Sequence, residues 1–167
     1  MKTPPTDVPL PSIFVDAHHH FLDTGNNDFQ QNFLGKLLPN TAYLPDQYQT
    51  QVIDSLREVG VQVLGSVHVE CVPDDGLKEV TWVDSLTSSS TKAIVGSCDL
   101  TLETIDQDLA TLKEASPKLK GIRWILDCVG PYAPNTATHI ATKRHDGIDY
   151  LRAVSYTHLT LPTILLV

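Results

Sequence analysis

Residues 61–69, VQVLGSVHV, predict a β-strand, because valines at alternate positions share one face of an extended chain. A turn follows at residues 73–76, and residues 77–86 place apolar side chains at every third position, as an amphipathic helix does. The apolar run at residues 93–98 then predicts another strand. A strand, a helix and a strand in this order favour a βαβ unit with parallel strands.

The same alternation of elements extends in both directions along the chain. The predicted strands are residues 13–18, 61–69, 93–98 and 119–126; the predicted helices are residues 46–59, residues 77–86 and a third helix capped by Thr101. Residues 21–44 are expected to form a long loop, and residues 146–152 could open another helix. This order predicts an α/β fold, and periodicity alone leaves half of a (β/α)8 barrel and an open parallel sheet as alternatives.

Three consecutive histidines, His18, His19 and His20, follow the first predicted strand. Side chains alternate between the faces of a strand, so His18 and His20 are expected to point the same way and His19 the opposite way. Two imidazoles on one face can hold one metal ion, which makes the chain a candidate metalloenzyme. Parallel strands end at a common rim, and the polar residues near those predicted ends are His18, His20, His68, Glu70, Asp99, Arg123 and Asp127.

The composition is that of one acidic globular domain. The chain has 167 residues and a net charge of −8 without a basic stripe, so a small-molecule substrate is a better expectation than nucleic acid or an anionic membrane. Its three cysteines are widely spaced, which favours buried thiols in a reducing compartment over a disulfide framework. The sequence contains no signal-peptide or transmembrane stretch, and a cytoplasmic location is therefore expected.

The two ends of the chain differ from the rest. Residues 1–11 are rich in proline and polar side chains and are expected to form a disordered arm. Residues 154–167 contain no charged side chain, and VSYTHLTLPT within them resembles a translated sequencing adapter, the alternative being a genuine terminal strand. On the adapter interpretation, residues 12–153 are an N-terminal fragment whose natural product continues past Ala153.

Four segments together resemble a known family. Residues 15–23, VDAHHHFLD, resemble the first-strand motif of the amidohydrolase superfamily. VGVQVLGSVHVEC, AIVGSCDL and SPKLKGIRWILDC resemble the next three strands in its amidohydrolase-related branch, which includes metal-dependent, fuconolactonase-like lactonases. The resemblance spans residues 12–153 and implies the N-terminal half of a (β/α)8 TIM barrel.

The resemblance also implies roles for individual residues. His18 and His20 would be the first two ligands of a divalent metal, most simply zinc, and Arg123 would hold a substrate carboxylate or carbonyl oxygen. The remaining ligands and the general acid/base come from later strands in the family, so no catalytic residue is assigned in this chain. Two alternatives stay open: His68 is a substrate-binding residue or a satisfied interior histidine, and Arg123 binds substrate or pairs with Glu70 or Asp127.

The function expected from the resemblance is hydrolysis of a lactone or amide bond by a full-length parent protein, with this truncated chain inactive. The alternatives are a metal-dependent phosphoesterase or nuclease of barrel fold, and a non-catalytic half-barrel. Half of a barrel leaves the first and fourth strands unpaired on one side and exposes apolar side chains. Self-association through these strand edges is therefore expected.

Overall fold

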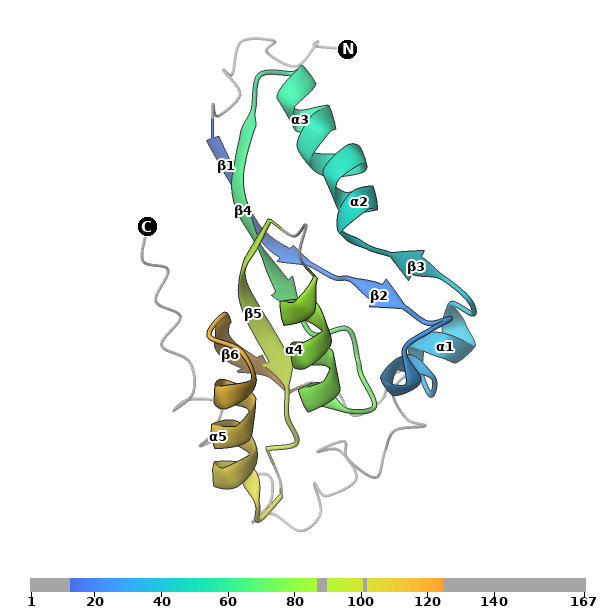
Figure 1. The fold of residues 1–167 in the computed structure, drawn as a ribbon, viewed down its shortest axis with the longest axis vertical. Coiled ribbons are helices and arrows are strands. Elements are labelled where there is room, and N and C mark those ends of the chain that lie inside the picture. Colours follow the sequence, from blue (N-terminus) through green and yellow to red (C-terminus); the bar gives the residue numbers. More distant parts are fainter. Residues whose placement is uncertain (1–12, 87–89, 101, 125–167) are drawn as a thin grey trace, which may run out of the picture.

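The computed structural model describes residues 13–86, 90–100 and 102–124 (Figure 1). The predicted N-terminal arm, the helix at residues 146–152 and the segment 154–167 lie outside these residues. A four-stranded parallel sheet forms the centre, in the order β1-β4-β5-β6. Its strands are β1 (Ile13–His19), β4 (Gln62–Val69), β5 (Thr91–Ser97) and β6 (Leu119–Arg123). The predicted α/β fold is confirmed, and neighbouring parallel strands in chain order are consistent with part of a TIM barrel.

Helices connect successive strands of this sheet. Between β1 and β4, α2 (Pro45–Tyr48), η2 (Gln49–Asp54) and α3 (Ser55–Glu58) follow one another without a break, where one helix was predicted. The other two are α4 (Gly76–Ser85) and α5 (Ile105–Ala115). The Asp75 side chain accepts a hydrogen bond from the Lys78 amide and so caps α4. Thr104 is the residue that precedes α5, and its side chain makes no capping bond. The predicted cap, Thr101, lies outside the described residues.

The core lies between the sheet and the helices α4 and α5. Val80 and Val83 of α4 are fully buried there with Ile94 of β5. The helix approaches the sheet closely at Gly96, where a Cβ atom would lie 2.8 Å from a methyl carbon of Val80. A glycine at this position therefore permits the packing of α4 on β5.

Residues 21–44 do not form the plain loop that was predicted. They contain a small antiparallel pair, β2 (Leu22–Asp23) with β3 (Ala42–Tyr43), together with η1 (Asp28–Gln30) and α1 (Leu34–Leu37) (Figure 1). Strands of two residues carry no recognisable alternation, which explains why the sequence did not indicate them. Two glutamine side chains form hydrogen bonds with the backbone of this segment. Gln30 Oε1 accepts from the Asp23 amide at 2.9 Å, and Gln31 Nε2 donates to the Thr24 carbonyl oxygen at 2.8 Å.

Candidate functional site

The strand β1 ends in an irregularity that separates the three histidines. Asp16 pairs with Ser66 and His19 with His68, so three steps along β1 match two along β4. The rings of His18 and His20 nevertheless lie together, with centroids 4.9 Å apart. His19 is only 7% exposed and packs against the ring of Tyr48 in α2 at 4.8 Å. The structure therefore brings His18 and His20 together and puts His19 into the core.

His20 is held in a form that suits a metal ligand. Its Nδ1 lies 2.8 Å from the carbonyl oxygen of Val69 in β4. A carbonyl can only accept, so Nδ1 carries the proton and Nε2 keeps its lone pair. Burial lowers the pKa of His20, and the Val69 carbonyl offsets this in part, so the neutral form predominates at pH 7. A neutral imidazole with one nitrogen tied to a carbonyl is the usual arrangement of a metal-binding histidine.

Asp16 organises the turn of chain that carries His18. One carboxylate oxygen accepts the His18 amide at 3.0 Å, and the other accepts the Tyr48 hydroxyl at 2.9 Å. Burial and this hydrogen bond raise the pKa of Tyr48, which keeps the hydroxyl protonated as a donor. Neither residue was predicted from the sequence to have a role, although an acidic residue two positions before His18 was a visible signal.

Arg123, at the end of β6, is bound to Glu70. Its Nε donates to Glu70 Oε1 at 2.5 Å, and an Nη donates to the Glu70 backbone oxygen at 2.9 Å. Glu70 is 2% exposed; burial raises its pKa, and Arg123 counteracts that rise. Of the two pairing partners left open by the sequence, the structure shows Glu70, and Asp127 lies outside the described residues. The Arg123 side chain is 32% exposed, and its contact with substrate stays a prediction.

His68 lies on the helix side of β4 and is fully buried. Its Nδ1 accepts the amide proton of Phe21 at 3.2 Å, and its ring stacks on the Phe21 ring with centroids 6.0 Å apart. Its Nε2 lies 3.8 Å from Glu79 Oε1 of α4. Burial lowers the pKa of His68 to about 4, so the ring is neutral at pH 7. Substrate binding by His68 stays a prediction, and the ring has no exposed surface in this arrangement.

Glu79 lies behind the site, next to His68, and was not predicted from the sequence. It is fully buried, and burial raises its pKa to about 8. Glu79 precedes Val83 by four positions, so both lie on the apolar face of α4. A carboxylate on the buried face of a helix was a signal available in the sequence.

The remaining polar and reactive groups add no ligand to the pair. Among residues 13–86, 90–100 and 102–124, histidine, cysteine, aspartate and glutamate form no cluster of three or more that could hold a metal.

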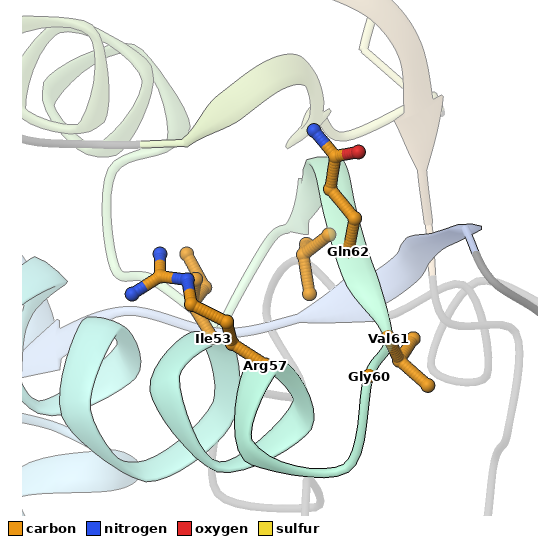
Figure 2. Close-up of a pocket in the computed structure, with 6 residues that line it drawn as sticks. Ile53, Arg57, Gly60, Val61 and Gln62 are labelled. Atoms are coloured by element: carbon orange, nitrogen blue, oxygen red, sulfur yellow. The ribbon is translucent and has the colours of Figure 1, made fainter.

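Cys71 and Cys98 are buried free thiols, as expected from the sequence, and burial raises their pKa values to about 12. A hollow of about 400 Å³ between α3 and the start of β4 is lined by Arg57 and Gln62 (Figure 2). His20 contacts Val69 at the other end of this strand. Within the described part of the chain, no helix has the length and apolar content needed to cross a bilayer.

Comparison with known proteins gives one distant structural match. No protein-family model matches the sequence, and no curated protein matches it. The chain is similar to the solved structure of amidohydrolase 2 from Bifidobacterium longum subsp. infantis, with 21% sequence identity and a TM-score of 0.40. The match covers 51% of this chain and 32% of that chain. The chain thus matches about a third of that protein's length.

Proposed function

We propose that this chain carries the first-strand part of a metal-dependent hydrolase site, and that the complete protein cleaves a lactone or amide bond. In this proposal His18 and His20 are two ligands of a divalent metal, most simply zinc. Arg123 is the group that contacts a substrate carboxylate or carbonyl oxygen.

The observation that carries the proposal is the pairing of two histidine rings at the carboxyl end of a parallel strand. The rings of His18 and His20 lie 4.9 Å apart, and the Val69 carbonyl leaves the Nε2 lone pair of His20 available. The ends of parallel strands are where α/β barrels place their chemistry. If the two histidines only stabilised the fold, the His18 ring would not need to be exposed beside the half-buried ring of His20.

The donor set fits a zinc site that needs further ligands. Imidazole nitrogens suit zinc, and a catalytic zinc takes three protein ligands and keeps one open position. In this proposal His18 and His20 are two of these ligands, and the described residues contain no cluster of three or more metal-binding side chains. When bound, the metal supplies Lewis-acid polarisation of a carbonyl and acidifies water. The chain's own contribution is to hold the two rings together, with His20 neutral and fixed by Val69, and to place the Arg123 cation, bound by Glu70, at the carboxyl end of β6.

A zinc titration of single-residue variants tests this proposal. We expect His18→Ala and His20→Ala each to lower the zinc affinity by more than the roughly 10–100-fold cost of losing an outer-shell partner. Affinity is measured by competition with a chromophoric chelator. The matched control is His19→Gln, which removes the imidazole between them. Because His19 belongs to the core, this control is expected to reduce stability and leave zinc affinity unchanged.

Unchanged affinity in both His18→Ala and His20→Ala would contradict the metal site and favour a non-catalytic half-barrel. Assays of lactones, amides and phosphate esters on the protein expressed from the complete natural gene then separate the reaction classes. Activity on phosphate esters alone would contradict the lactone or amide assignment.

A further inference from the structure

Two neighbouring residues of β4 hold the two residues that follow β1. The Val69 carbonyl oxygen accepts from His20 Nδ1 at 2.8 Å, and His68 Nδ1 accepts from the Phe21 amide at 3.2 Å. The contacts join residues 49 and 47 positions apart. We call these two contacts the β4 clamp.

The β4 clamp requires opposite tautomers in its two histidines. The Val69 carbonyl only accepts, so His20 carries its proton on Nδ1. The Phe21 amide only donates, so His68 has a bare Nδ1 and carries its proton on Nε2. Each tautomer therefore follows from a partner whose hydrogen-bonding role is fixed.

The far side of the His68 ring faces Glu79 inside the core. Glu79 Oε1 lies 3.8 Å from His68 Nε2 and also accepts the Cys71 amide at 2.8 Å. His68 and Glu79 are both fully buried, and among the described residues His68 Nε2 and Glu79 Oε2 have no hydrogen-bond partner. Burying such groups costs stability, and apolar side chains of similar volume would pack here at lower cost. Packing alone therefore does not account for the pair.

We propose that His68, with Glu79 behind it, is a positioning residue that fixes the orientation and tautomer of His20. His68 holds the Phe21 amide, and this contact sets the chain direction that lets the His20 ring reach the Val69 carbonyl. Glu79 faces the Nε2 proton of His68 and favours the tautomer that can accept from Phe21. The functional value of this arrangement rests on the proposed role of His20 as a metal ligand.

The test compares ring tautomers and zinc affinity in variants of the 167-residue chain. Long-range proton–nitrogen spectra of ¹⁵N-labelled protein report which ring nitrogen of His20 carries the proton, with no metal present. We expect Nδ1 protonation in the wild type and loss of that single tautomer in His68→Leu, with zinc affinity lower by about 10–100-fold. In His68→Asn the side-chain oxygen replaces Nδ1 as acceptor, and both properties are expected to return toward wild-type values.

Two further variants separate positioning from general destabilisation. Ile94→Ala removes a buried side chain paired with His68 in the sheet register but outside the β4 clamp; we expect a less stable protein with an unchanged His20 tautomer. His68→Gln places its amide near the Nε2 position and leaves Phe21 without an acceptor, so it should behave like His68→Leu. If His68→Leu does not fold, the comparison of His68→Asn with His68→Gln tests the positioning role in its place.

The proposal is overturned if wild-type His20 carries its proton on Nε2. It is also overturned if His68→Leu, or His68→Gln in its place, keeps both the Nδ1 tautomer and the zinc affinity. Failure of the proposed function looks different: zinc binding would then be insensitive to His18→Ala and His20→Ala, while the metal-free tautomer comparison still decides the positioning role.

Discussion

His19 and His20 are neighbours in sequence, yet they belong to different parts of the molecule. His19 is 7% exposed and packs against Tyr48 in the core between the sheet and its helices. His20 is half-buried at the rim, where one nitrogen is bound by Val69 and the other is available. The comparison shows that the helix-covered face takes a histidine ring into its packing, while the strand end fixes one nitrogen of His20 by a hydrogen bond and leaves the ring partly exposed.

The largest expected contrast between the two regions concerns phenylalanines. Phe21 is fully buried in the core, whereas Phe14 on β1 is 40% exposed. We expect Phe21→Ala to lower the free energy of unfolding by about 3–5 kcal/mol, because it removes a large buried side chain and leaves a cavity. Phe14→Ala should cost about 1 kcal/mol or less. Urea denaturation followed by circular dichroism measures both; similar losses would show that β1 is as well packed as the core.

The sequence was sufficient for the regular parts of this architecture. Valine alternation at residues 61–69 identified β4, and the three-residue spacing of apolar side chains identified α4. The opposite orientations of His18 and His19 followed from the same alternation. These features are local consequences of backbone geometry, so a single sequence carries them.

The features that the sequence did not indicate depend on contacts between distant residues. The β2–β3 pair is too short to have a period, and the side-chain amides of Gln30 and Gln31 bind the backbone at the end of β2. The inward orientation of His68 toward Glu79 depends on where α4 packs on the sheet. The sequence placed His68 near the rim, but only the packing shows that its ring is enclosed.

An intermediate effect is expected from the pH dependence of stability. The pKa of Glu79 is raised by burial to about 8, above its ordinary value of 4.5. Between these values the unfolded chain releases a proton that the folded chain keeps, so stability falls as pH rises, by up to about 1.4 kcal/mol per pH unit. His68 acts in the opposite sense: its pKa is lowered from 6.5 to about 4, and stability is lost as pH falls through that range.

Glu79→Gln separates these two contributions. The glutamine oxygen can still accept the Cys71 amide, while the titration is removed. We expect a smaller loss of unfolding free energy between pH 6.5 and 8 in urea titrations, because the variant lacks the buried carboxyl whose pKa is raised to about 8. Glu114→Gln, an exposed carboxylate on α5, is the matched control and should leave the profile unchanged. A wild-type slope retained in Glu79→Gln would contradict the assignment.

A substitution at the exposed edge of β1 is expected to have the smallest effect on stability and a clear effect on self-association of the chain. Ile13, Phe14 and Val15 are 57%, 40% and 50% exposed. Among the described strands, β1 is at the edge of the sheet and has β4 as its one neighbour. Exposed apolar strand edges favour pairing between copies of a chain, and lysine on such an edge opposes it.

We expect Val15→Lys to shift sedimentation velocity profiles toward the monomer. The change in unfolding free energy should be within about 0.5 kcal/mol, as for other surface substitutions. Lys36→Glu, on the exposed surface of α1, changes charge away from this edge and should leave the profiles unchanged. If Val15→Lys associates as the wild type does, β1 is not the interface, and the exposed apolar side chains of this strand are covered by another part of the protein or simply tolerated in solvent.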